Sequence, residues 1–498
     1  MNLNLLIILP LLCALGILAG NRNAAKWISL AGAVVQSVLA FILLIYYWHE
    51  EHIHPETRWF FSERHAWFPS WNIDYFIGVD GISIAMILLT AAVVLAGILV
   101  SWHENKMTRE FFFLLQLLSA GAYGFFISLD LFTLFFFLEV AVIPKYLLIG
   151  IWGSGKKEYS ANKLALMLMG GSALVLIGML GVYYSGGSAG TFDMVGLAVS
   201  HIPLAVQKVF FPFLFIGFGV FSALFPFHTW VPDGHSSAPT AASMFLAGIS
   251  MKLGGYGCLR VAANLMPEAA HMYAPAIIAL STIAIIYGAF ATMMQTDFKY
   301  VNAYSSVSHC GFVLLGIGML TRTSINGAVL QMISHGLMTA LFFAAIGMLY
   351  ERTHTRELNK LGGVMKAIPF IGGLFFLAGL CSLGLPGLSG FVAEMTVFTG
   401  SWEHPETWYR VATILACASI VVTAVYILRS IGQAVMGPAT NPTFHVLRDA
   451  RWNEKLASVV LLCGILVIGI LPFIVYQLIA PGTDHLYQQF QHLTLLNP

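Results

Sequence analysis

Charged residues are scarce in this chain. Asp, Glu, Lys and Arg together make up 9% of its 498 residues, whereas hydrophobic residues make up 58%. The mean hydropathy is +0.81. A composition so poor in charge excludes an ordinary soluble protein. We therefore expect an integral membrane protein that contacts the lipid bilayer and has no nucleic-acid partner.

Sequence motifs that hold redox cofactors are absent as well. The chain has six cysteines but no CxxC pair and no Cys/His cluster, and all six fall in apolar segments. Iron–sulfur clusters are usually held by several cysteine thiolates, and no strand-bounded glycine fingerprint indicates a dinucleotide site. We therefore expect neither a cofactor nor a metal on this chain, so any electron transfer belongs to partner proteins.

Apolar runs long enough to cross about 30 Å of hydrocarbon recur from end to end. We predict an all-α integral membrane protein with about 14 transmembrane helices, at residues 2–19, 27–48, 82–102, 111–128, 130–151, 163–185, 207–228, 240–262, 271–294, 301–319, 325–350, 368–400, 410–433 and 456–477. The first run resembles a signal-peptide core but lacks a basic leader, so we expect it to be the first helix. Most basic residues follow odd-numbered helices, which predicts that both termini lie outside the cytoplasm.

Proline and glycine interrupt two predicted helices in a similar way. The seventh ends in FPFHTWVP (225–232), and the twelfth contains GLPGLSG (384–390). Proline breaks a helix, and broken backbone in a membrane is tolerated where protein or water covers it. Each break falls in the fourth helix of a five-helix unit, helices 4–8 and 9–13, which is the pattern of an inverted repeat. Simple kinking is the alternative.

These repeats divide the predicted membrane domain, which spans the whole sequence, into four parts. They are helices 1–3 (1–110), the first repeat (111–263), the second repeat (271–435), and the last helix with a C-terminal tail (456–498).

Four ionisable side chains fall deep inside predicted helices, namely Glu139, Lys145, Lys252 and Glu394. A charge at the bilayer centre costs roughly 2.5–3.5 kcal/mol even on lenient scales, so it persists where it is partnered or wetted. We predict that these residues line an ion path, with His335 as a proton relay. Structural alternatives stay open: Glu139 as a neutral tie between helices, Lys145 reaching the interface, Glu394 capping a half-helix, and His335 bonded within the bundle.

For other polar residues in and beside the predicted helices, we expect roles in the structure and not in transport. We interpret three histidines as hydrogen-bonding groups, and four charged residues at helix ends as solvated. The histidines are His228, His235 and His309; the charged residues are Asp80, Asp130, Asp297 and Lys299.

Four segments together resemble a known family. They are FHTWVPDGHSSAPT (227–240), QTDFK (295–299), AYSSVSH (303–309) and YERTHTR (350–356). The combination resembles the antiporter-like proton-pumping subunits of respiratory complex I (NADH-quinone oxidoreductase) over nearly the whole chain. It is most similar to the chain M family, because the sequence stops soon after the last predicted helix, whereas chain L carries a long lateral helix.

The resemblance implies an enzyme subunit that couples NADH oxidation and quinone reduction in other subunits to proton translocation. It implies FMN, iron–sulfur clusters and quinone in partner subunits, chain L-like and chain N-like neighbours, and a bacterial inner membrane. Glu139 corresponds to the family's helix 5 carboxylate and Lys252 to its central lysine. His335 corresponds to the neighbour of that lysine, and Glu394 to the exit-side carboxylate.

One position departs from the family pattern. A lysine usually precedes the break in helix 7, and here the corresponding residue is Phe221. We hypothesise that Lys145 supplies the missing positive charge from helix 5. Three other functions stay open: a subunit of a multi-subunit cation/proton antiporter, a membrane-bound hydrogenase module, and a structural subunit that spaces its neighbours.

Overall fold

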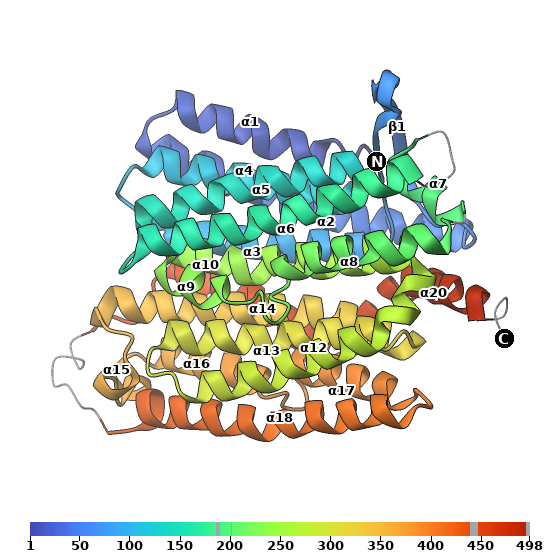
Figure 1. The fold of residues 1–498 in the computed structure, drawn as a ribbon. Helices are drawn as coiled ribbons and strands as arrows, with labels where there is room; N and C mark the ends of the chain where they lie inside the picture. The colour runs from blue at the N-terminus through green and yellow to red at the C-terminus, as the bar shows by residue number, and fades with distance from the viewer. Residues whose placement is uncertain (186–189, 201, 439–446, 495–498) are drawn as a thin grey trace.

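The computed structural model describes residues 1–185, 190–200, 202–438 and 447–494. Long helices lie side by side with their axes nearly parallel (Figure 1). Within these ranges, ten helices are long and apolar enough to cross a membrane, and two shorter helices are also apolar. The prediction of a largely helical membrane protein is confirmed.

The first part of the chain forms α1 (Leu5–Ala19), α2 (Arg22–Ile53), α3 (Gly81–Val100), α4 (Thr108–Ile127), α5 (Leu131–Trp152), α6 (Lys157–Ser185), α7 (Met194–Val199), α8 (Leu204–Phe221) and α9 (Trp230–Ser237). One continuous helix follows, made of α10 (Thr240–Phe245), the π-helical turn η3 (Leu246–Ser250), α11 (Met251–Gly257) and a second π-helical turn, η4 (Cys258–Ala263).

The remaining helices are α12 (Pro267–Met293), α13 (Phe298–Gly318), α14 (Arg322–Thr353), α15 (Val364–Ala367), α16 (Pro369–Ser382), α17 (Ser389–Trp402), α18 (Thr407–Ile431) with its π-helical end η6 (Gly432–Met436), α19 (Trp452–Ile470) and α20 (Pro472–Thr494). Single 3-10 turns are η1 (Pro69–Trp71), η2 (Ser101–His103) and η5 (Leu358–Lys360). The apolar stretch of α14 is 94% buried, so this helix is the centre of the bundle.

Every predicted helix overlaps an observed one, and two of them, at residues 368–400 and 456–477, are each divided in two. The break between α16 and α17 falls at the glycine and proline segment that predicted it, and α8 ends at Phe221, just before the proline segment of the seventh predicted helix. The division between α19 and α20 was not predicted. Leu471 leaves the helical region there (φ −123°, ψ 57°), because a residue that precedes proline disfavours the α conformation.

In the part predicted as a C-terminal tail, residues 478–494 belong to α20. Residues 495–498, the end of that predicted part, lie outside the described ranges. A β-hairpin of β1 (Phe60–Phe68) and β2 (Ile73–Val79) was not predicted either. Each strand is too short to form an apolar run of the length that predicts a membrane span.

The two ends of the bundle carry different elements. The N-terminus, β1, α7 and α20 lie at one end, whereas α15 lies at the opposite end (Figure 1). The β-hairpin and α7 follow even-numbered predicted helices, and α15 follows an odd-numbered one. The alternation on which the predicted orientation rests is therefore present in the fold.

Candidate functional site

Lys252 lies at the centre of the continuous helix that runs from α10 to η4. Its side chain is buried, and π-helical turns flank α11 on both sides. Such turns often mark functional sites. Glycines allow the neighbouring helix to approach closely: a Cβ on Gly254 would lie 2.4 Å from the Ser222 nitrogen at the end of α8. The sequence thus fixes Lys252 in a tightly packed core.

The Lys252 ammonium bonds to two groups. It donates to the Ala247 carbonyl one turn back, and its Nζ lies 2.7 Å from Nδ1 of His335 on α14. Which of the two side chains holds the shared proton depends on the tautomer of the imidazole. The predicted neighbours on helices 8 and 11 are therefore in direct contact.

His309 on α13 extends this contact toward Glu394. Its ring centroid lies 5.4 Å from that of His335, and its Nδ1 lies 3.4 Å from Oε1 of Glu394 on α17. The other ring nitrogen is 3.1 Å from the hydroxyl of Ser382. Lys252, His335, His309 and Glu394 thus form a buried row, which we call the central relay; its two imidazoles are neighbours by ring contact, and Nε2 of His335 has no hydrogen-bond partner among the described residues.

His309 is the residue that sequence reasoning missed, because it was interpreted as structural. The available signal was its place in a polar run in the middle of an apolar helix, beside Ser305, Ser306 and Ser308. All of these serines are buried. Periodicity alone does not show which helix this polar face meets.

The break between α16 and α17 positions Glu394. Gly384 adopts a left-handed conformation (φ +75°), and a Cβ there would lie 2.7 Å from Oε2 of Glu394. Ser389, the first residue of α17, accepts a hydrogen bond of 2.8 Å from Ser334 on α14. The Glu394 carboxylate faces His309, with Oε1 3.4 Å from Nδ1 of that ring.

Glu139 and Lys145 form a second group on α5. Lys145 is 1% exposed, whereas Glu139 is half-buried. Oε1 of Glu139 and Nζ of Lys145 lack hydrogen-bond partners among the described residues, but the carboxylate lies within electrostatic range of the ammonium. The structure therefore separates the predicted site residues into this pair and the central relay. Burial of the ammonium also removes the alternative that Lys145 reaches the interface.

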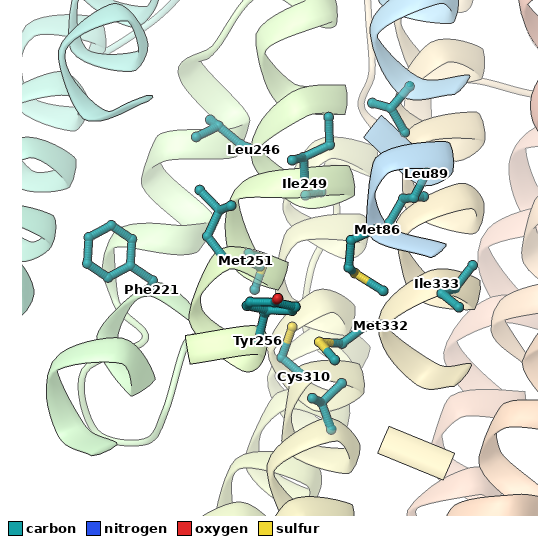
Figure 2. Close-up of a cluster of buried hydrophobic side chains, with 14 of the residues drawn as sticks. Met86, Leu89, Phe221, Leu246, Ile249, Met251, Tyr256, Cys310, Met332 and Ile333 are labelled. Atoms are coloured by element: carbon teal, nitrogen blue, oxygen red, sulfur yellow. The ribbon is translucent and has the colours of Figure 1, made fainter. Parts of the chain in front are cut away.

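Apolar side chains surround the centre of the bundle. Figure 2 shows Met86, Met251, Tyr256 and Met332 gathered around α11, with Phe221 projecting from α8. Phe221 is buried at the position where the resemblance implies a lysine. The packing excludes bulk water, which strengthens every electrostatic interaction in the central relay.

Several residues interpreted as solvated charges are in fact buried. Asp80 pairs with Arg260, Asp130 accepts from the first amides of α5, and Lys299 donates to the Ala238 carbonyl at 2.6 Å. The interpretation fails for these three because elements from distant parts of the sequence cover the helix ends. Asp297 is partly exposed and pairs with Arg356 at 2.5 Å.

His228 and His235 pack against aromatic rings, and the hydrogen-bonding role predicted for His235 is not seen in the described part of the chain. His228 is buried and packs against Phe225 and Tyr287. The His235 ring stacks on Phe343 at 5.1 Å. Neither nitrogen of His235 has a hydrogen-bond partner in the described part of the chain.

The chain is similar to proteins of one family along most of its length. The family described as NADH:quinone oxidoreductase/Mrp antiporter, TM, matches residues 128–421. An NAD(P)H-quinone oxidoreductase chain 4 from Synechococcus sp. is 39% identical over 478 residues, covering 94% of this chain and 89% of that relative. The chain 4 of Gloeobacter violaceus is 35% identical over 489 residues, covering 97% and 92%.

Solved structures share the fold. A chain of respiratory complex I from Thermus thermophilus with bound NADH superposes with a TM-score of 0.89 at 24% identity, covering 98% of this chain and 99% of that one. A chain of the Mrp complex from Dietzia sp. gives a TM-score of 0.84 at 20% identity, with 97% of both chains covered.

Proposed function

Because the chain belongs to the NADH:quinone oxidoreductase/Mrp antiporter transmembrane family, we propose that it is a proton-translocating membrane subunit of an NADH:quinone oxidoreductase, respiratory complex I. Its relatives are named as chain 4 of NAD(P)H-quinone oxidoreductases. The chain is then part of an enzyme whose redox chemistry takes place on other subunits. FMN, iron–sulfur clusters and quinone belong to those partners.

One observation carries this proposal, namely the continuity of the central relay. Lys252 touches His335 at 2.7 Å, and His309 touches Glu394 at 3.4 Å, with the two imidazole rings side by side. Each of these groups exchanges a proton, and a buried charge persists in a membrane where it is partnered or wetted. A row of titratable groups across three helices and a broken fourth has the arrangement of a proton wire.

The pair on α5 supplies the input to this wire. Glu139 is the half-buried carboxylate from which protons enter, and Lys145 provides the positive charge opposite it. Phe221 is apolar and buried at the helix 7 position, so Lys145 takes the role of the lysine that is absent there. The burial of Lys145 together with its electrostatic interaction with Glu139 supports this assignment.

The magnitudes favour several groups acting in series. Two unit charges about 8 Å apart interact by about 2 kcal/mol at an effective dielectric near 20. Moving one proton against about 150 mV requires about 3.5 kcal/mol. A single charge contact is too weak, whereas two or three in sequence suffice. The pair on α5 and the central relay together provide that number of contacts.

The fold is proposed to contain fourteen spans and two inverted repeats. The first repeat comprises residues 111–263 and the second 271–435, preceded by helices in 1–110 and followed by 456–498. The breaks after α8 and after α16 support this proposal, because discontinuous helices at corresponding places in two repeats are typical of an ion site.

Among complex I subunits, we assign the chain to the chain M type, between chain L-like and chain N-like neighbours. Basic residues concentrate at the end of the bundle that carries α15, so that end faces the cytoplasm of a bacterial inner membrane. Both termini then lie on the outer side.

The deciding experiment combines purification with transport. The chain is expected to co-purify with subunits that hold flavin and iron–sulfur clusters, and NADH oxidation by the reconstituted complex should acidify the vesicle lumen. Sodium-driven proton exchange in a complex without flavin would instead identify a multi-subunit antiporter, the second function that the family includes. Co-purification with hydrogen-evolving activity would identify a membrane-bound hydrogenase.

A further inference from the structure

A buried ion pair lies on the helix of Lys252, toward the end of the bundle that carries β1 and α20. Arg260 in η4 donates to Asp80, the residue that caps the first turn of α3. The two side chains are 1% and 3% exposed. An ion pair this deeply buried is expensive to desolvate and adds little net stability by itself. Its position therefore calls for a role in addition to holding the fold together.

Positive charge exceeds negative charge at this pair. Nε and Nη1 of Arg260 have no hydrogen-bond partner among the residues that the structure describes. A second guanidinium, that of Arg58, donates to Asn264 at 3.2 Å, and both arginines lie over the ring of Trp59. The cluster thus contains two guanidinium groups, those of Arg58 and Arg260, and one carboxylate, that of Asp80, so its charges sum to a net positive charge.

The same positive charges affect the pKa of His485 on α20. Burial lowers its pKa, and the positive charges of Arg58 and Arg260 lower it further, whereas Asp484 opposes the shift. Asp484 itself is paired with Arg322. The positive charges of Arg58 and Arg260 therefore act on α20 at His485.

Tyr256 lies between the relay and the arginines. Lys252, Tyr256 and Arg260 are four residues apart, so they share one side of the helix, and the Arg260 guanidinium lies 5.7 Å from the Tyr256 ring centroid. The tyrosine hydroxyl is 2.9 Å from that of Ser83, and its ring packs edge-on against Phe126 at 5.2 Å. Tyr256 thus fills the space through which a proton would leave Lys252 in this direction.

Close packing of α20 covers the ion pair of Arg260 and Asp80 at this end of the bundle. A Cβ on Gly81 would lie 1.7 Å from the Leu478 carbonyl oxygen, and a Cβ on Gly482 would lie 2.7 Å from Oδ2 of Asp80. These glycines let α20 lie directly against the start of α3. The ion pair is therefore sealed from this end of the bundle by α20.

We propose that Arg260, held by Asp80 and backed by Tyr256, is an electrostatic barrier that prevents protons on Lys252 from escaping toward β1 and α20. Protons then leave Lys252 only through His335, His309 and Glu394. This inference rests on the proposed function, because a barrier is needed only if Lys252 carries protons. Fixed positive charge excludes cations from the pores of membrane proteins by the same physics.

The size of the effect follows from the helix geometry. Eight residues separate Lys252 from Arg260, which is about 12 Å at 1.5 Å per residue. At that separation and an effective dielectric near 20, one positive charge lowers roughly tenfold the probability that a second proton-borne charge occupies the neighbouring site. We expect the passive proton conductance of the complex to rise by about this factor when the charge of Arg260 is lost.

The test uses the whole complex in sealed vesicles. A potassium diffusion potential drives proton entry without NADH, and an internal pH dye records its rate. Arg260→Gln should leak about tenfold faster than the unsubstituted complex, and Arg260→Lys should stay tight. Asp80→Asn is the matched control, because it disrupts the same ion pair but raises the positive charge, so it should not leak.

Two outcomes would overturn the barrier: Arg260→Gln vesicles as tight as the unsubstituted ones, or an Asp80→Asn leak equal to that of Arg260→Gln, since the latter would indicate damaged packing. If Arg260→Gln fails to assemble, Arg58→Gln removes one charge from the cluster and leaves the ion pair intact. A leak there supports the barrier, and unchanged conductance refutes it.

The same vesicles separate this inference from the proposed function. Loss of NADH-driven pumping in Lys252→Ala, together with a tight Arg260→Gln complex, would refute the barrier and leave the function standing. Normal pumping in Lys252→Ala would refute the function itself.

Discussion

Replacing His309 tests the central relay at the point where the sequence gave the weakest indication. The ring of His309 lies 5.4 Å from that of His335, and its Nδ1 lies 3.4 Å from the carboxylate of Glu394. In His309→Gln the amide can still bond to Ser382 but cannot take up a proton. We expect the complex to assemble and its pumping to fail.

The structure gives a magnitude for this loss. Nδ1 of His309 lies 3.4 Å from Oε1 of Glu394, and two unit charges at about that distance attract by about 5 kcal/mol at an effective dielectric near 20. A proton carried on the ring would gain this attraction, so its loss lowers the population of that intermediate by roughly three to four orders of magnitude. A water molecule that replaces the ring lacks its basicity, so it does not restore the step.

The assay is NADH-driven acidification of vesicles that contain the purified complex, measured with a pH-sensitive dye. Electron transfer to an added quinone is recorded in the presence of an uncoupler, and co-purification of the redox subunits shows assembly. Gln331→Leu is the matched control, because it removes the other group within reach of His309 Nδ1, at 3.3 Å, without removing a titratable side chain. An unchanged ratio of protons pumped to NADH oxidised in His309→Gln would refute the relay.

Three further predictions follow from the described contacts. Glu139→Gln and Lys252→Ala should each abolish the coupled proton gradient in vesicles, and normal pumping in either variant would count against the assignment. Lys145→Met should also abolish pumping, since it removes the proposed substitute for the helix 7 lysine, whereas Lys156→Met on the exposed loop that follows α5 should leave it unchanged. Gly81→Val should prevent stable docking of α20, because its Cβ would collide with the Leu478 carbonyl. Protease sensitivity of the C-terminal segment measures that docking, and full protection in Gly81→Val would contradict the packing argument.

The sequence by itself determined that the chain lies in a lipid bilayer, where most of its helices are, and where proline and glycine interrupt them. Apolar runs long enough to span a bilayer specify helices, because backbone groups in lipid must form hydrogen bonds within their own segment. Proline and glycine also marked the ends of α8 and α16 correctly. The deeply placed Lys252 and Glu394 stood out for the same reason, since charge inside an apolar run is costly and local in its signal.

Only the tertiary structure decided which of these groups meet. His309 became part of the relay because α13 turns its polar face toward α14 and α17, and the sequence of a helix does not show which neighbours its polar face meets. Asp80 and Arg260 lie 180 residues apart in sequence, so their pairing follows from packing alone. The C-terminal helix α20 was missed for a related reason: its polar and apolar residues alternate too closely to signal a span, and its place is set by the glycines against which it packs.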